Sequence, residues 1–294
     1  MSDFRCGSIA FAGRPNAGKS SLLNALLGEK LAIVSAKAQT TRHLLTGMLT
    51  TDDCQYLLLD LPGYQTRHPG LLNRALNRRA VEGTRDCDTV AFVVEALRYG
   101  SQDRTVLARI PREARIVVAV NKIDLVKDRS ELLPFLQRLS QESEFAALVP
   151  VSARSGENLP ELLRMLREGL PQGPAAYPVD QLTDRSERFF AAEILREKLF
   201  RRLGEELPYR CDVALESFKE EGKLRRIEAT IWVERDSHKP IVIGAAGATL
   251  KKIASDARRE METRFGGKVM LSVWIKVKRD WTSDARALRQ LGYA

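Results

Sequence analysis

The sequence predicts an α/β fold with a mainly parallel sheet, followed by a smaller α+β domain. Three observations predict it. Residues 8 to about 170 alternate short apolar runs with amphipathic stretches, which is typical of buried parallel strands joined by helices. Residues 170–178 then hold three prolines and one glycine, which cannot continue a helix. Beyond them the order of elements changes, and 294 residues are enough for two domains.

In the first part, apolar runs predict strands and amphipathic stretches predict helices. The predicted strands lie at 9–12, 55–59, 90–94, 116–120 and 148–151. The predicted helices lie near 22–27, 71–83, 102–109, 131–140 and 159–168. Because ligands of such sheets bind at the carboxyl ends of the strands, the loops that follow these strands are the candidate functional sites.

The second part has a different order: helix, two strands, two helices and a last strand. The helix is expected near 186–203, the strands near 210–217, 225–234 and 268–278, and the two helical segments on either side of Gly244–Gly247. We therefore expect one domain over 1–172, a linker over 173–183 and a second domain over 184–294.

Composition narrows the class of protein. The chain is 44% hydrophobic and 29% charged, which is typical of a soluble globular protein. It has no apolar run long enough to cross a bilayer, and its first residues lack the apolar core of a secretory signal, so an intracellular location is expected. Four scattered cysteines and three distant histidines favour neither disulfides nor a metal site. A net charge of +9 favours nucleic acid or another anionic partner.

The loop after the first predicted strand fits the phosphate-binding pattern G-x-x-x-x-G-K-[ST]. It consists of Gly13, Arg14, Pro15, Asn16, Ala17, Gly18, Lys19 and Ser20. Glycines let backbone N–H groups approach phosphates, and the following helix adds partial positive charge at its N-terminus. Lys19 would reach the β- and γ-phosphates, and the Ser20 hydroxyl would bind Mg²⁺. These residues predict a nucleotide site.

Two further segments complete the expected phosphate and metal contacts. Asp60, Leu61, Pro62 and Gly63 follow the second predicted strand. The Asp60 carboxylate can hold Mg²⁺ through water, and the Gly63 N–H can meet the γ-phosphate. Of the pair Thr40 and Thr41, we favour Thr41 as the hydroxyl that binds Mg²⁺ when the γ-phosphate is present. Tyr64 stands where many regulatory GTPases have glutamine, so slow intrinsic hydrolysis is expected unless backbone or another ion holds the water.

The loop Asn121-Lys122-Ile123-Asp124 predicts which base is bound. The Asp124 carboxylate can accept both the N1–H and the exocyclic amine of guanine, a pair of donors that adenine lacks. Asn121 would tie this loop to the phosphate loop, and the Lys122 stem would cover the base plane. A backbone N–H of Ser152-Ala153-Arg154, after the last predicted strand, would meet the guanine oxygen.

The second domain carries a G-x-x-G turn followed by a basic helix. Gly244, Ala245, Ala246 and Gly247 form the turn, and Lys251, Lys252, Arg258 and Arg259 follow it. In KH modules such a turn clamps the nucleic-acid backbone, and the basic side chains contact phosphates. The order of elements is one of the two arrangements of that module. The competing interpretation is a tight helix–helix turn whose basic residues are merely solvated.

Taken together, these motifs resemble the bacterial Era family of ribosome-assembly GTPases. The resemblance extends over nearly the whole chain through GRPNAGKS, QTTRH, DLPG, NKID, SAR and IGAAGATLKKIA. It implies a GTPase domain joined to a type II KH domain, binding of GTP, GDP and the 3′ end of small-subunit ribosomal RNA, and a role in maturation of the 30S subunit. It also implies a cytoplasmic, monomeric protein with some peripheral association with the inner membrane.

The resemblance also implies roles for individual residues. Lys19, Asn16 and Thr41 are the expected catalytic residues, with Ser21 completing the phosphate loop. Asn16 can help to hold a potassium ion, and a hydrophobic residue replaces glutamine in this group, which fits Tyr64.

Five positions depart from the family pattern. Ala17, Ser21 and Leu61 replace the usual Val, Thr and Thr. Ala245-Ala246 leaves the RNA-clamping turn without charge, so RNA binding weaker than the family norm is expected.

Three alternatives remain open from the sequence. The first is an RNA chaperone whose nucleotide site binds GTP but barely hydrolyses it. The second is a membrane-surface GTPase that uses its basic face for anionic lipid, and the third is an ATPase, which the NKID loop disfavours.

Overall fold

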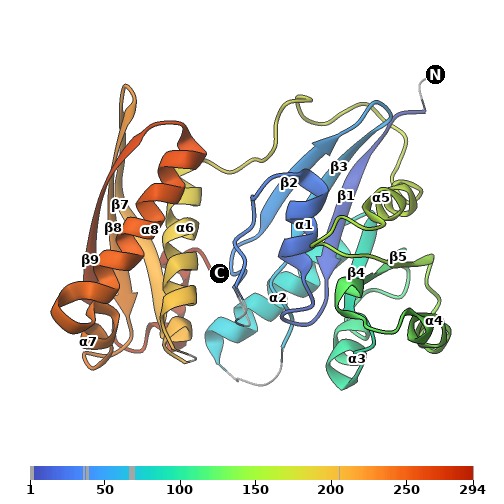
Figure 1. Cartoon of the computed structure of the whole chain (residues 1–294), viewed down its shortest axis with the longest axis horizontal. Coiled ribbons are helices and arrows are strands. Elements are labelled where there is room, and N and C mark those ends of the chain that lie inside the picture. The colour runs from blue at the N-terminus through green and yellow to red at the C-terminus, as the bar shows by residue number, and fades with distance from the viewer. Residues whose placement is uncertain (1–2, 36, 38–39, 66–69, 205, 294) are drawn as a thin grey trace. The chain divides into compact units, whose positions relative to one another are not determined.

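The computed structural model describes residues 3–35, 37, 40–65, 70–204 and 206–293. Contacts divide the chain into two compact units. The first unit comprises Met1–Val34, Thr41–Pro69 and Asn73–Asp184, and the second comprises Ser35–Thr40, Gly70–Leu72 and Arg185–Ala294. Each unit has its own sheet (Figure 1).

The first unit is built on a six-stranded sheet of order β2-β3-β1-β4-β5-β6. The strands are β1 (Arg5–Ala12), β2 (Leu45–Thr50), β3 (Cys54–Asp60), β4 (Thr89–Glu95), β5 (Ile116–Asn121) and β6 (Ala147–Pro150). All neighbours pair in parallel except β2 and β3, which are antiparallel. The predicted mainly parallel sheet is confirmed.

Helices cover both faces of this sheet. They are α1 (Lys19–Leu27), α2 (Leu71–Arg85), α3 (Ser101–Leu107), α4 (Leu132–Leu139) and α5 (Leu159–Arg167). On one face, Phe92 and Val118 pack with Val106 of α3 and Phe135 of α4. On the other face, α1 and α5 contact each other and the sheet. Because both faces are covered, residues 90–94 of β4 are fully buried, which explains their unbroken apolar run.

The antiparallel strand β2 was not expected from the sequence. Leu45 and Met48 of this strand are buried, but burial does not alternate along it, so it lacks the period-two signal of a half-buried strand. A short turn in which the Thr51 N–H donates to the Cys54 carbonyl joins β2 to β3. Pairing with a neighbour, rather than its own pattern, makes this segment a strand.

The proline-rich segment after α5 lies along the first unit. Gln172 forms an isolated bridge with Arg5, and Thr183 forms one with Gly47 of β2. The buried Gln55 amide accepts hydrogen bonds from the Ala176 and Tyr177 N–H groups and donates to the Tyr177 carbonyl. A single glutamine therefore holds the middle of the segment expected to be a linker.

The second unit has a three-stranded sheet of order β7-β8-β9. Its elements are α6 (Glu187–Arg202), β7 (Cys211–Glu221), β8 (Leu224–Val233), α7 (His238–Ile243), α8 (Ala248–Phe265), β9 (Lys268–Val277) and α9 (Ala285–Gln290). β7 and β8 are antiparallel, whereas β8 and β9 are parallel and need the α7–α8 crossover. Figure 1 shows α6 and α8 side by side across the sheet. The order predicted from the sequence is found, with α9 as an unexpected short helix.

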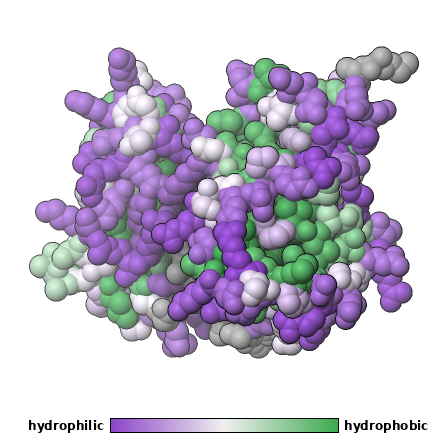
Figure 2. Space-filling model, turned by 45° about the vertical axis from the view of Figure 1, so that its right-hand side comes forward, coloured by the Kyte–Doolittle hydropathy of each residue, from purple (hydrophilic) through white to green (hydrophobic). Residues whose placement is uncertain are grey.

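Among the described residues, none of the helices combines the length and the apolar character that crossing a membrane requires. Hydrophilic side chains cover most of the face shown in Figure 2.

Candidate functional site

The loop between β1 and α1 has a backbone that only glycine suits at two points. Gly18 has φ 103°, and a Cβ there would lie 2.2 Å from Nδ2 of Asn121. A Cβ on Gly13 would lie 2.5 Å from the Val93 carbonyl oxygen. The two glycines of the motif therefore allow the loop to pass close to β4 and to the end of β5, where a phosphate can meet the N-terminus of α1.

Lys19 curls back over this loop. Its Nζ donates to the carbonyls of Gly13 and Arg14, at 3.1 and 3.2 Å, and only 6% of the residue is exposed. Burial lowers the pKa of Lys19 to about 8, although the charge of Asp60 acts in the opposite direction. An ammonium group poised in this way gains a strong partner when a phosphate enters the loop.

Three oxygen-bearing side chains meet beside Lys19. The Ser20 Oγ lies 2.8 Å from the Thr41 Oγ1 and donates to Oδ2 of Asp60 at 2.7 Å, while Thr41 donates to the same oxygen at 3.0 Å. Two hydroxyls and one carboxylate are the hard oxygen donors that Mg²⁺ prefers, so this set fits that ion. The hydroxyl of Thr40 instead bonds with Ser35 and the Lys37 carbonyl, so Thr41 is the threonine brought to the cluster.

The Asp60–Gly63 segment passes directly over the phosphate loop. A Cβ on Gly63 would lie 3.0 Å from the backbone nitrogen of Pro15 and 3.1 Å from Nζ of Lys19. Tyr64, the next residue, packs against the core and lies under the guanidinium of Arg109, 5.9 Å from the ring centroid. Leu61 is buried, in keeping with an apolar residue at that position.

Asn121 joins three loops. Its Nδ2 donates to the Ala17 carbonyl at 3.1 Å, and its Oδ1 accepts from the Ala153 N–H at 3.0 Å. The phosphate loop, the Asn121–Asp124 loop and the 152–154 loop are thus tied by one buried amide. Asn16 and Ser21, which also belong to the expected site, lie in the loop and in α1.

Asp124 is exposed at the mouth of this arrangement and is oriented by Ser152. The buried Ser152 hydroxyl donates to Oδ1 of Asp124 at 2.7 Å, and it accepts from the Arg154 and Ser155 N–H groups. A carboxylate held on one side and open to solvent can accept the paired donors of a guanine edge.

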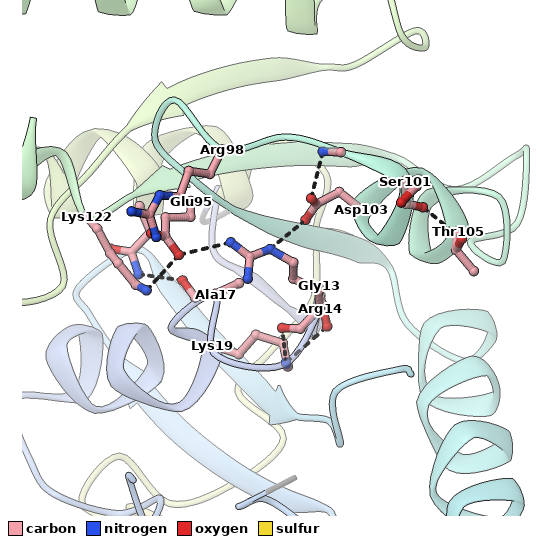
Figure 3. A network of polar contacts seen from close by, with 12 residues as sticks. Gly13, Arg14, Ala17, Lys19, Glu95, Arg98, Ser101, Asp103, Thr105 and Lys122 are labelled. Carbon is pink, nitrogen blue, oxygen red and sulfur yellow. Dashed lines mark hydrogen bonds and ion pairs between the residues drawn. The ribbon is translucent and has the colours of Figure 1, made fainter. Parts of the chain in front are cut away.

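Two carboxylates of this region, Glu95 and Asp103, belong to none of the sequence motifs described above. Figure 3 shows them in a network with Arg14 and Lys122. The signal that could have revealed Glu95 is its place, a single charge that ends the apolar run Val90–Val94 at the ligand-binding edge of the sheet.

The G-x-x-G turn of the second unit joins α7 to α8. Gly244 ends α7 with φ 75°, and Gly247 begins α8 with φ 78°. Ala246, between them, also has a positive φ of 49°. A Cβ on Gly244 would lie 2.2 Å from Oγ1 of Thr249, whereas a Cβ on Gly247 meets open space.

The basic residues after the turn, Lys251, Lys252, Arg258 and Arg259, are exposed. Lys252 pairs with Asp256 at 3.1 Å, and Arg258 pairs with Glu262 at 2.8 Å, each one turn along α8. Ile241 of α7 is 57% exposed beside the turn. The turn therefore offers backbone donors, cations and an apolar side chain on one helical pair, although RNA phosphates would compete with the two carboxylates.

The first unit has the features of a P-loop guanine-nucleotide-binding protein: a mainly parallel sheet, a phosphate loop and an Asn-Lys-Ile-Asp loop at the strand ends. The second unit has the order of elements and the G-x-x-G turn of a KH domain. Residues 8–122 match the family described as 50S ribosome-binding GTPase, and residues 206–282 match the KH domain. The chain is 48% identical over 292 residues to the GTPase Era of Nitrosomonas eutropha, covering 99% of both chains. It belongs to the Era family of GTPases.

Solved structures agree with this assignment. A variant of Aquifex aeolicus Era bound to GDP·AlF4⁻ is 34% identical, with a TM-score of 0.95 over 99% of this chain and 100% of that one. Era in complex with MgGDPNP and nucleotides 1506–1542 of 16S ribosomal RNA is 33% identical, with a TM-score of 0.94 over 99% of both chains.

Proposed function

We propose that this protein hydrolyses GTP, binds the 3′ end of small-subunit ribosomal RNA and assists assembly of the 30S subunit. The observation that carries the proposal is the link from Asp124 through Ser152 and Asn121 to the phosphate loop, which suits one guanine nucleotide. Membership of the Era family and the complexes of its relatives with GDP·AlF4⁻, MgGDPNP and 16S ribosomal RNA support it.

Single-turnover phosphate release from GTP, with and without an RNA of nucleotides 1506–1542, tests this proposal. A rate of phosphate release that changes when the RNA is added supports a GTP-hydrolysing protein that responds to RNA. Tight GTP and RNA binding without release would instead support the alternative, an RNA chaperone whose nucleotide site barely hydrolyses.

The residues of the first unit divide the work of hydrolysis. Lys19 would hold the β- and γ-phosphates, and Ser20, Thr41 and Asp60 would hold Mg²⁺, Asp60 through water. Mg²⁺ in that place would neutralise charge on the phosphate oxygens. Gly63 senses the γ-phosphate through its N–H. The apolar setting of Tyr64 supports attack by a water that is positioned electrostatically rather than by a side-chain base.

A potassium ion near Asn16 is a further hypothesis. It would add positive charge where the phosphates carry most charge in the transition state. Hydrolysis faster in potassium than in sodium would support it, and equal rates would remove it.

We retain the domain division into residues 1–172, 173–183 and 184–294, with GTP hydrolysis in the first and RNA binding in the last. The RNA contacts are assigned to Gly244–Gly247, Lys251, Lys252 and Arg258. We propose that the protein is a monomer in the cytoplasm and that it associates peripherally with the inner face of the membrane. Liposome flotation with RNA as competitor tests the membrane part.

GTP affinity is expected to fall at alkaline pH. The pKa of Lys19 is about 8 in the nucleotide-free loop, and a bound triphosphate would raise it, so binding takes up a proton above that pH. For one such group the affinity should be about tenfold lower at pH 9 than at pH 7. Equilibrium titration of a fluorescent GTP analogue measures this.

Lys19→Arg is the control for the alkaline effect. Arginine keeps its charge throughout this range, so the variant should show a flatter profile that contains only the titration of the nucleotide itself. A profile as steep in Lys19→Arg as in the parent protein would contradict the prediction.

Gly247→Asp is expected to weaken RNA binding about tenfold, because a carboxylate in the clamping turn repels phosphate. The side chain has open space, and aspartate tolerates a positive φ, so the fold should survive. Filter binding with the 1506–1542 RNA measures the effect.

Gly247→Asn is the matched control, since it has the same shape without the charge. It should retain affinity within about threefold of the parent protein. Equal losses in both variants would mean that bulk, not charge, is what the turn excludes.

A further inference from the structure

Glu95, the last residue of β4, gathers cations from three segments (Figure 3). Its Oε2 lies 2.9 Å from Nη2 of Arg14 in the phosphate loop and 2.9 Å from Nζ of Lys122 in the base-recognition loop, Asn121–Asp124. Its Oε1 lies 3.1 Å from Nη1 of Arg98. One carboxylate therefore bridges the loop that holds phosphates and the loop that holds the base.

Two of these ion pairs are shielded from solvent and one is not. The side chain of Glu95 is 11% exposed, and those of Arg14 and Lys122 are 19% and 30% exposed, whereas Arg98 is 75% exposed. Shielded charges interact more strongly than exposed ones, which water and salt screen. The bonds to the two loops thus matter more than the bond to Arg98.

The carboxylate is ionised at neutral pH. Burial raises the pKa of Glu95, but the hydrogen bonds and charges of Lys122 and Arg14 outweigh burial and hold the pKa below its ordinary value. Removal of this charge would leave two cations facing each other in a partly buried site.

The backbone explains why the charge is needed at this position. Glu95 pairs with Asn121 in the register of β4 and β5, so it lies beside the start of the base-recognition loop. Lys122 has φ 68°, a left-handed conformation that costs free energy for a residue with a side chain. The bond from Nζ of Lys122 to Glu95 offsets that cost and fixes the direction of the side chain.

Arg14 has a second anchor, on helix α3. Its Nε lies 3.3 Å from Oδ1 of Asp103, which is 3% exposed, and Oδ2 of Asp103 accepts from the Gly100 N–H at the start of α3. The phosphate loop is thus attached to the end of β4 through Glu95 and to α3 through Asp103.

We propose that Glu95 is a positioning residue that sets the spacing between the phosphate loop and the guanine loop before nucleotide binds, through Arg14 and Lys122. This inference rests on the proposed function: Glu95 would hold the two loops of the guanine-nucleotide site at the correct distance. Loops that are already in place lose little entropy when nucleotide binds, so binding is tighter. We expect the tighter binding to appear as slow release of nucleotide.

Glu95→Gln tests this, since it keeps the shape and removes the charge. GDP and GTP should dissociate about tenfold to a hundredfold faster, as expected for loss of hydrogen bonds to a charged group. The KM for GTP should rise with little change in kcat, because Glu95 pairs with Arg14, Lys122 and Arg98 and not with the residues assigned to the γ-phosphate and Mg²⁺. Stopped-flow release of fluorescent GDP and steady-state hydrolysis give both values.

Arg98→Ala is the matched control. It removes the exposed partner of the same carboxylate and should leave release rates within about twofold. Lys122→Met completes a double-mutant cycle with Glu95→Gln. If Glu95 acts through Lys122, Glu95→Gln should accelerate nucleotide release much less in the Lys122→Met protein than in the parent protein.

The outcomes separate cleanly. Unchanged release from Glu95→Gln, or a fall in kcat at constant KM, would overturn the inference. A thermal melt shows whether Glu95→Gln folds. If it does not, the rates of nucleotide release from Arg14→Met, Lys122→Met and the double variant decide: additive effects on the rate overturn the inference, and strong coupling between them supports it. Failure of the parent protein to bind guanine nucleotide would instead overturn the proposed function itself.

Discussion

Asp124→Asn is expected to move nucleotide preference from guanosine to xanthosine triphosphate. The Ser152 hydroxyl donates to Oδ1 of Asp124, and it would hold the amide oxygen of an asparagine in the same way. The amide NH₂ would then face the base, where it opposes the amine of guanine and suits the carbonyl of xanthine. Loss of two hydrogen bonds to a charged acceptor, about 1.5–3 kcal/mol each, predicts GTP binding about 10²–10⁴-fold weaker.

Competition titrations with both triphosphates measure this change. Asp128→Asn is the control, because it removes an exposed carboxylate four residues along that accepts from the N–H and hydroxyl of Ser130. It should leave the preference unchanged. An Asp124→Asn protein that still prefers GTP would remove the basis for guanine recognition at this loop.

Lys19→Met is expected to slow GTP hydrolysis by about 10²–10³-fold, which is typical for loss of one preorganised donor to transition-state charge. Methionine fills the same volume without a charge that must be buried, so the nucleotide-free protein should be no less stable. Single-turnover hydrolysis and a thermal melt of the same sample separate the two effects.

Lys127→Met is the control for this variant. Lys127 is exposed, so its loss removes one positive charge without touching the phosphate loop. Hydrolysis should stay within about twofold of the parent rate. A Lys19→Met protein that hydrolyses as fast as Lys127→Met would contradict the assigned role of Lys19.

Most of the proposed nucleotide site could be predicted because it consists of short local segments. Gly13 and Gly18 permit a backbone that other residues cannot adopt so close to β4 and Asn121, so the motif itself encodes the loop. Asn121 ends the buried strand β5 and Asp124 lies just beyond it, and the chemistry of the Asp124 carboxylate suits guanine. The structure places the Thr41 hydroxyl beside Ser20 and Asp60, and its binding to Mg²⁺ stays a prediction.

Other features could not be predicted because their partners are far apart in sequence. Arg14, Glu95 and Lys122 come from three separate segments, and no local pattern says that one carboxylate joins them. Gln55 holds the backbone at Tyr177 across more than a hundred residues. The strand β2 exists because β3 offers it an unpaired edge, not because of its own periodicity.

By itself, the sequence determined the class of fold, the nucleotide loops and the turn between the helices of the second unit, because glycine geometry, strand burial and functional groups act over a few residues. Only the tertiary structure decided which charges neutralise one another at the edge of the sheet and which hydroxyls share the carboxylate of Asp60. Those pairings depend on distances between strands that the sheet sets as a whole, and electrostatic energy in a buried site depends on those distances.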